Sequence, residues 1–328
     1  MTSGGSRWLM TIHGPTVELE CTVPSLEPSL DVLLDDFCID RFPKGSLPAT
    51  GIIHPYEQHE VAAALSPTAR HIGRSADQTD LYEDPEAPDC FWIVDDRWGI
   101  SRIDLRLSQW RSWIIPQPTI DLLRVAELSV VRPMAELLRP RGLQLAPVIS
   151  AVRDGFAVLI VCPFGIEPEL TAMIADNYKI IGQRWTALRE EDGRVALLRM
   201  PGRIERSVAP RLRFGADEWD HWIDVTRGYP GSSQSHAFCD AVVVIESGRR
   251  HKAHLREKTP PQAPDLLRQQ WPMTELNTVG LPGGIVAALV DSCRCYELQL
   301  SRNSKDLLAL LNSMRSAAVR PQERSAAA

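Results

Sequence analysis

The spacing of hydrophobic and polar residues changes near residue 119. Up to about residue 118, short alternating segments are separated by proline-rich and acidic connections. In the stretch CFWIVDDRWGISRIDL, the apolar segments 91–94 and 100–105 flank Asp95, Asp96 and Gly99, a pattern typical of a β-hairpin. We therefore expect a smaller amino-terminal α+β domain over residues 1–118.

Aromatic and acidic residues of this first domain have a structural and a functional interpretation. Trp92, Trp98, Trp110 and Trp113 crowd the hairpin region, and aromatic residues on neighbouring strands usually pack across the sheet. The adjacent acids Asp35–Asp36 and Asp95–Asp96 resemble metal ligands, but successive side chains in extended backbone point to opposite faces. We expect core tryptophans and turn or solvent-facing acids, and we predict no metal site.

A helical pattern follows from Thr119. Apolar residues recur at spacings of two to four positions as far as Leu138, and Gly142 is a typical helix stop. Pro133 interrupts the pattern, because a proline inside a helix removes one hydrogen bond and crowds the preceding turn. We expect two helices or a kink in this segment.

After residue 142 the pattern predicts an α/β domain. Its order is a strand (LQLAPVISAV), an Asp-Gly turn, a strand (FAVLIVC), a loop and helix (PFGIEPELTAMIADN) and a further strand (YKIIG). Two more strand pairs are expected, with turns at Asp192-Gly193 and Ser247-Gly248. Short apolar patterns then predict a helix over 264–270, a strand over 295–300 and an amphipathic helix capped by Ser304. We place this domain at 119–316 and a disordered tail at 317–328.

Composition and charge narrow the classes of function. The 328 residues are 44% hydrophobic and 24% charged, which is typical of a globular protein. The formal charge of −6, without a basic stripe, predicts no nucleic-acid partner. No apolar run reaches the roughly 18 residues of a membrane helix, and the amino terminus lacks a signal-peptide pattern. We expect no membrane partner and a cytoplasmic location.

Seven cysteines occur without any C-x-x-C pair, so we expect reduced thiols and no zinc site. Cys293 and Cys295 alternate within CRCYELQL, and residues two apart in a strand face the same side. A packed apolar surface is the simpler interpretation of that pair. A metal or redox role for the two thiols is the alternative.

The segment DGFAVLIVCPFGIEPELTAMIADNYKIIGQRW places a tight turn between a strand and a helix, where P-loop proteins hold phosphate. This layout resembles the HPr kinase/phosphorylase family over roughly residues 130–312, and the ending CYELQLSRNSKDLLALL is similar to the closing strand and helix of its relatives. The resemblance implies an HPr-kinase-like P-loop domain with a mixed sheet and flanking helices.

The phosphate loop of that family reads G-x-x-G-x-G-K-[ST], and this chain departs from it. The matching stretch runs from Cys162 to Glu169, and only Gly165 agrees. Pro168 stands at the position of the lysine, so a cation and an N–H donor are both missing. Glu167 and Glu169 add negative charge where phosphates would lie, and such repulsion is worth roughly 4 kcal/mol per charge pair at about 4 Å.

Two further positions depart from the family pattern. Gln183 and Arg184 replace the paired acids expected after the next strand, and Pro147 replaces the histidine expected before the hairpin. We therefore expect a degenerate, non-catalytic pseudokinase that binds or regulates a protein or peptide partner and takes no cofactor. Pro168 would then serve as a residue of the first helical turn, where its missing N–H is tolerated.

Two enzymatic alternatives remain open. The first is an active ATP-dependent protein serine kinase, using ATP and magnesium, whose phosphate contacts have moved to arginines; Arg184 and the arginines at positions 203, 206, 211 and 213 are candidates. The second is a hydrolase or transferase that uses the loop RGYPGSSQSHAFCD, with His236 and Asp240 as catalytic candidates. Loop polarity alone also explains that composition.

Overall fold

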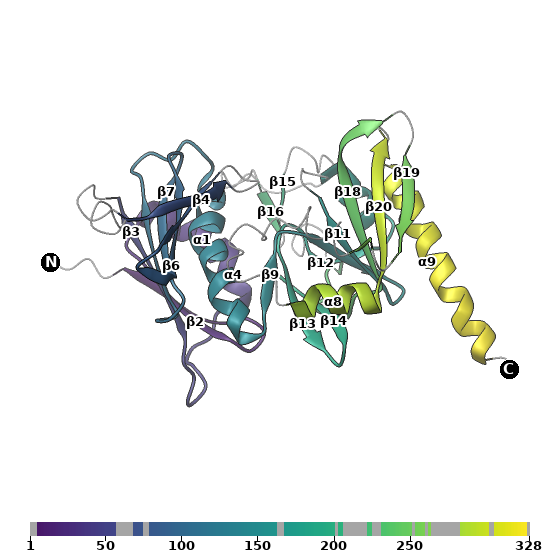
Figure 1. Ribbon diagram of the computed structural model, residues 1–328, viewed down its shortest axis with the longest axis horizontal. Helices are drawn as coiled ribbons and strands as arrows, with labels where there is room; N and C mark the ends of the chain where they lie inside the picture. Colours follow the sequence, from purple (N-terminus) through teal and green to yellow (C-terminus); the bar gives the residue numbers. More distant parts are fainter. Residues whose placement is uncertain are drawn as a thin grey trace. The chain divides into compact units, whose positions relative to one another are not determined.

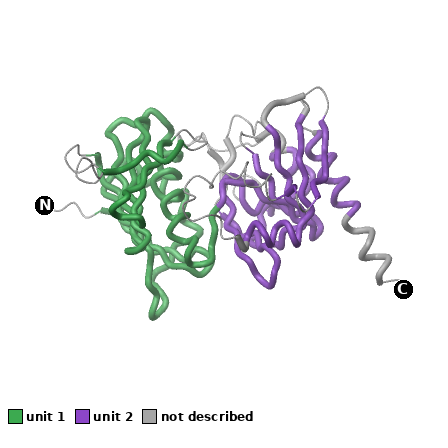
Figure 2. Tube along the Cα trace, viewed as in Figure 1, with its two compact units in different colours: residues 1–145 green, residues 146–328 purple. Residues whose placement is uncertain are grey.

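The computed structural model describes residues 5–56, 68–74, 79–162, 167–200, 203–205, 222–224, 231–250, 253–259, 262–263, 283–301 and 305–326. The chain forms two compact units, Met1–Leu145 and Ala146–Ala328 (Figure 2). The division falls after Leu145, whereas the sequence analysis expected it near residue 118. The helical segment after Thr119 therefore belongs to the first unit.

The first unit is built on an eight-stranded sheet with the order β1-β2-β3-β8-β7-β6-β5-β4. Its strands are β1 (Ser6–Thr11), β2 (Thr16–Cys21), β3 (Ala49–Pro55), β4 (Arg70–Arg74), β5 (Asp80–Asp84), β6 (Ala87–Asp95), β7 (Gly99–Asp104) and β8 (Gln109–Ile114) (Figure 1). β2, β3 and β8 run parallel, and the other neighbours are antiparallel. The expected hairpin is β6-β7, in which Asp95 pairs with Gly99.

The tryptophans and Asp95 have the structural roles expected of them, and Asp35 and Asp36 lie exposed in the 3₁₀ turn Asp35–Phe37. Trp92, Trp98, Trp110 and Trp113 are all buried. The Asp95 carboxylate accepts from the backbone N–H of Arg97 at 2.9 Å and from the Arg97 side chain. Asp95 is therefore a turn residue.

Helices of the first unit are α1 (Glu27–Leu34), α3 (Leu122–Ala126) and α4 (Arg132–Leu138), with a π-helical turn at Glu127–Val131 between the last two and 3₁₀ turns at Pro24–Leu26, Asp35–Phe37 and Arg139–Arg141. α3 contacts α1, and α4 contacts β3, β7 and β8. These contacts explain why the segment joins the first unit. Pro133 lies just after the π turn, so the expected interruption takes the form of a wider turn within a continuous helical segment.

The second unit is a mixed α/β unit with several sheets. A six-stranded sheet has the order β12-β10-β11-β18-β20-β19, a four-stranded sheet the order β17-β14-β13-β9, and β15 pairs with β16. The strands of these sheets are β9 (Gln144–Ala146), which spans the division after Leu145, β10 (Ile149–Arg153), β11 (Phe156–Val161), β12 (Lys179–Gly182), β13 (Thr186–Glu191), β14 (Arg194–Leu198), β15 (Arg203–Glu205), β16 (Trp222–Asp224), β17 (His236–Phe238), β18 (Ala241–Arg250), β19 (His254–Lys258) and β20 (Arg294–Ser301).

Turn-forming residues end several strands of this unit. The Asp154-Gly155 turn joins β10 to β11, and Asp192-Gly193 joins β13 to β14; all four residues have positive φ, between 49° and 79°. Both expectations are confirmed. Pro147 separates β9 from β10, where one continuous strand was expected, because proline cannot donate to a strand ladder.

The prediction of a turn at Ser247-Gly248 is wrong. β18 continues through both residues to Arg250, with a register shift between Ile245 and Arg249 in its pairing with β20. Pairing with β20 resumes at Arg249 opposite Leu300. The strand therefore continues through Gly248 with an irregularity in its register and does not turn there.

Helices of the second unit are α5 (Glu167–Ala175), α8 (Gly283–Ser292) and α9 (Lys305–Ala326). Residues from α5 and α9 pack on one face of the six-stranded sheet in a buried cluster; α9 contributes Leu307, Leu311 and Met314 at helical spacing. α8 contacts β13 and β14 of the four-stranded sheet. The helix α9 extends to Ala326, past Pro321, through positions that were expected to be a disordered tail.

Strand β11 and the first five residues of β18, 241–245, are buried on both faces, as the continuous apolar pattern predicted. The expected helix over 264–270 and the Ser304 cap lie outside the described residues. Among the described helices, none is long and apolar enough to cross a bilayer.

Candidate functional site

The loop after β11 and the candidate Asp240 lie at opposite ends of the strands of the six-stranded sheet, whereas His236 lies on β17 of the four-stranded sheet. β11 pairs in parallel with β18, and the backbone N–H of Asp240 donates to the carbonyl oxygen of Ala157 on β11 at 2.9 Å. Cys162 follows the other end of β11, five residues after Ala157, which is about 16 Å along a strand. The loop after β11 and the residues around Asp240 are therefore separate candidate sites.

The carboxyl edge carries the loop that resembles a P-loop. Gly165 lies outside the described residues, as do the side chains of Glu167 and Glu169. α5 begins at Glu167, so Pro168 is the second residue of the helix. This confirms the expectation that Pro168 occupies the first helical turn, where a missing N–H is tolerated.

Gln183 and Arg184 follow β12 at the same edge, since β10 pairs antiparallel with both β11 and β12. Gln183 is 4% exposed, and its Oε1 has no hydrogen-bond partner among the described residues. The preceding Gly182 lies so close to Trp185 that a Cβ atom would be 2.3 Å from the Trp185 carbonyl oxygen. The chain turns tightly at this end of β12, where Gln183 and Arg184 supply an amide and a guanidinium at the positions of the paired acids in the family pattern.

Asp240 joins the starts of two strands at the amino edge. Its Oδ2 accepts from the backbone N–H of Ala157 at 2.8 Å, and its Oδ1 lies 3.6 Å from Nη2 of Arg194. Burial raises the pKa of this carboxyl, while the Ala157 N–H and Arg194 act against that shift. These contacts make Asp240 a link between β11 and β18.

His236 has other partners than Asp240. Its Nε2 lies 3.9 Å from Oε2 of Glu191, and its ring is edge-on to Phe238 with centroids 5.0 Å apart. The guanidinium of Arg194 lies over the same Phe238 ring, 4.5 Å from its centroid. The side chain of His236 is 41% exposed. Phe238 and Arg194 thus lie between the two catalytic candidates, and His236 pairs with Glu191 whereas Asp240 pairs with Ala157 and Arg194.

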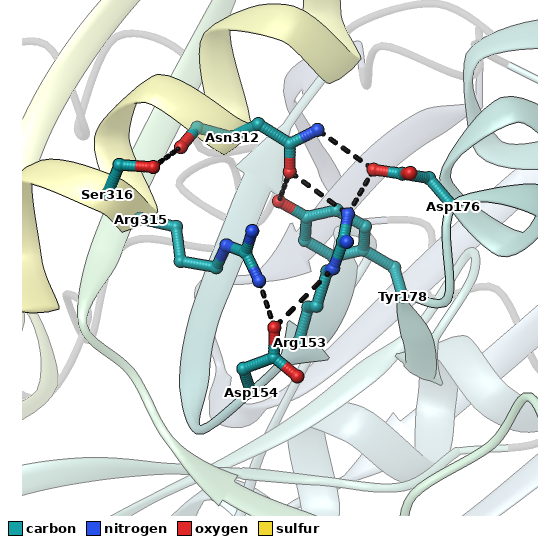
Figure 3. A network of polar contacts seen from close by, with 7 residues as sticks. All are labelled: Arg153, Asp154, Asp176, Tyr178, Asn312, Arg315 and Ser316. Atoms are coloured by element: carbon teal, nitrogen blue, oxygen red, sulfur yellow. Dashed lines mark hydrogen bonds and ion pairs between the residues drawn. The ribbon is translucent and has the colours of Figure 1, made fainter.

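A polar network that sequence reasoning missed ties α9 to the hairpin β10-β11 (Figure 3). Nη1 of Arg153 contacts the Asp176 carboxylate and lies 3.2 Å from Oδ1 of Asn312. The Asn312 Nδ2 donates to Asp176 at 2.8 Å, and the Tyr178 hydroxyl donates to Oδ1 of Asn312 at 3.2 Å. Asn312 therefore joins three side chains from the body of the unit.

A second connection comes from Arg315, whose guanidinium contacts the carboxylate of Asp154 at the hairpin tip. The Arg153 guanidinium also lies over the Tyr178 ring, 5.6 Å from its centroid. Burial raises the pKa of Tyr178 to about 12, although Arg315 and Arg153 partly oppose the shift. The network holds α9 by polar contacts in addition to its apolar face.

Only one part of this network had a sequence signal. The Asp154-Gly155 pair marks the hairpin turn, but Asn312 and Arg315 lie about 160 residues further along the chain. Nothing in their local sequence distinguishes them from the exposed face of an amphipathic helix. Among the described residues, no group of three or more His, Cys, Asp or Glu could hold a metal ion.

Comparison with models of known protein families finds no match, and comparison with curated proteins finds none. Among solved structures, the chain is similar to the HPr(Ser) kinase/phosphatase from Coxiella burnetii. The two share 12% sequence identity with a TM-score of 0.33, over 55% of this chain and 99% of the other. A TM-score of this size does not by itself establish a shared fold.

Proposed function

We propose that the second unit is an HPr-kinase-like domain that has lost phosphoryl transfer and acts as a binding or regulatory pseudokinase for a protein or peptide partner. The sequence resemblance and the order of β10, β11, α5 and β12 support this assignment. The observation that carries it is Pro168 at the second position of α5. That position corresponds to the phosphate-binding lysine in the family pattern.

The local chemistry disfavours a phosphate at this loop. A proline supplies neither a backbone N–H nor a cation, whereas phosphate at a helix start is held by both. Gln183 and Arg184 leave no carboxylate directly after β12 to hold magnesium. The hydrophobic core beneath the loop is kept, since β11 and the buried residues of α5 belong to one cluster. The proposal is therefore a retained scaffold without its phosphate-binding groups.

A thermal-shift titration tests the proposal. We expect no rise in melting temperature with millimolar ATP, ADP or GTP, with or without magnesium. A native-state ligand at ten times its Kd would raise the melting temperature by about 3–6 °C. A magnesium-dependent rise, together with phosphoryl transfer that depends on residues 162–169, would contradict a non-catalytic role.

A rebuilt loop makes the test sharper. The triple variant Glu167→Gly, Pro168→Lys, Glu169→Ser restores the last three positions of the family motif, and the matched control carries Pro168→Ala in place of the lysine substitution. If the scaffold is that of a P-loop, the rebuilt variant gains nucleotide binding and the control gains less. Equal behaviour of the two variants would argue against a P-loop scaffold.

An active kinase is the second candidate, and the position of Arg184 after β12 is the observation that favours it. A guanidinium at the carboxyl edge can recognise phosphate. This candidate predicts nucleotide binding by the wild-type chain that Arg184→Ala weakens at least tenfold and Arg189→Ala, on β13, leaves unchanged. Calorimetry with ATP and magnesium distinguishes it from the pseudokinase.

A further inference from the structure

Two cysteines that are far apart in the sequence meet at the starts of neighbouring strands. Cys239 precedes β18 and Cys293 precedes β20, and these strands pair in parallel with Ala241 opposite Arg294. The backbone N–H of Arg294 donates to the carbonyl of Asp240 at 3.1 Å. This ladder brings residues 239 and 293 to adjacent positions at the amino edge of the sheet.

Side-chain contacts bring the two thiols together. The Cys293 Sγ lies 3.2 Å from the carbonyl oxygen of Cys239, to which it donates. The Cys239 Sγ donates to the carbonyl oxygen of Ala241 at 3.4 Å. A disulfide joins residues whose Cα atoms lie about 4.4–6.8 Å apart, and neighbouring strands lie about 4.8 Å apart, so the register of β18 and β20 places Cys239 and Cys293 within reach of a disulfide.

The environments of the two thiols assign them different roles. Cys293 is partly exposed and Cys239 is fully buried. The neighbouring Cys239 and the Ser292 hydroxyl lower the pKa of Cys293, although burial and the nearby Asp240 act against that shift. The neighbouring Cys293 and burial raise the pKa of Cys239. A partly exposed thiol of lowered pKa is the better nucleophile.

Cys295 is excluded as the partner. It lies on β20 beside Val242, is buried, and burial raises its pKa to about 12. The spacing of Cys293 and Cys295 in the sequence suggested a same-face pair, but Cys293 precedes the strand and turns toward Cys239. All seven cysteines are free thiols in the structure.

We propose that Cys239 and Cys293 form a reversible disulfide when the protein meets a hydroperoxide, so that the starts of β18 and β20 become covalently joined. The Cys293 thiolate attacks the peroxide, the O–O bond breaks, and Cys293 becomes a sulfenic acid as the alcohol or water leaves. The Cys239 sulfur then attacks that sulfur, a second water leaves with the Cys239 proton, and the S–S bond forms. A thiol reductant reverses the step.

The test uses the full chain, reduced and then treated with hydrogen peroxide. We expect the intact mass to fall by about 2 Da, two thiols to become unavailable to alkylation, and peptide mapping to join residues 239 and 293. Cys293→Ser should abolish the linked peptide, and the control Cys295→Ser should keep it. In Cys239→Ser, dimedone should label Cys293, which reports the sulfenic acid without requiring the disulfide.

Folding is checked by the melting temperature of each variant and by repeating the oxidation in denaturant. The 239–293 link should predominate only in the folded wild-type chain, because the strand ladder creates the proximity. A folded chain that links Cys293 to another cysteine, or forms no 239–293 peptide, would overturn the proposal. So would equal formation of that peptide in denaturant.

Discussion

The indole Nε1 of Trp110 donates to the carbonyl oxygen of Ser129 at 3.0 Å, and the Ser112 hydroxyl donates to the same oxygen at 2.8 Å. Pro133, four residues after Ser129, has no N–H with which to donate to this carbonyl. Two side chains of β8 therefore supply the donors that the helix lacks. The strand β8 thus satisfies a carbonyl that Pro133 leaves without its usual helical donor.

This relationship predicts a difference between two buried tryptophans. Trp110→Phe removes a donor to a buried carbonyl, whereas the Trp98 Nε1 has no partner among the described residues. Both substitutions lose similar volume. We expect Trp110→Phe to lower the free energy of unfolding by about 1 kcal/mol more than Trp98→Phe, measured by urea denaturation. Equal losses would show that the indole bond to Ser129 contributes nothing.

Asn312 is expected to hold α9 on the second unit. Asn312→Ala removes one acceptor shared by Tyr178 and Arg153 and one donor to Asp176, so we expect faster amide exchange over residues 305–317 and a loss of about 1–3 kcal/mol in the free energy of unfolding. The control is Ser316→Ala, since Ser316 is exposed and donates only within α9 in the contacts shown in Figure 3. Similar exchange in both variants would contradict this role.

Tyr178 predicts an alkaline transition. Its pKa is raised to about 12 in the folded protein, against about 10 in an unfolded chain. The folded state therefore retains the proton more strongly, and the resulting stabilisation is complete below pH 10 and is lost as the pH rises from about 10 to about 12. Absorbance titration at the phenolate band should show that one of the five tyrosines titrates at a higher pH than the others, and Tyr178→Phe should lack this titration.

The urea stability of the wild-type chain and of Tyr178→Phe should converge over the same pH interval. A constant difference between them would mean that the pKa of Tyr178 is the same in the folded and unfolded states.

Asp240 is expected to act as a structural link between strands. Asp240→Ala leaves the Ala157 N–H without its acceptor, which costs about 1–3 kcal/mol, whereas Asp240→Asn keeps an oxygen in the same place and should cost less. Thermal and urea unfolding of the two variants should show that order. The hydrolase alternative predicts instead that Asp240→Asn abolishes an activity while leaving stability near that of the wild type.

Local sequence determined the elements whose signals lie within a few residues. The hairpin turns at Asp154-Gly155 and Asp192-Gly193, the buried strand β11 and the start of α5 around Pro168 follow from backbone preferences and from apolar periodicity, which depend on near neighbours. The chemical departures at Pro168 and Gln183 are also visible in the sequence alone. They rest on residue types, not on distances.

Tertiary structure decided what depends on distant residues. Local preference indicates a turn at Ser247-Gly248, but β18 continues through both residues because its pairing with the parallel strand β20 resumes beyond the glycine. The meeting of Cys239 with Cys293, across 54 residues, follows from strand order, which no local pattern encodes. Contacts of this kind are set by which strands become neighbours, and side-chain packing over the whole unit selects that order.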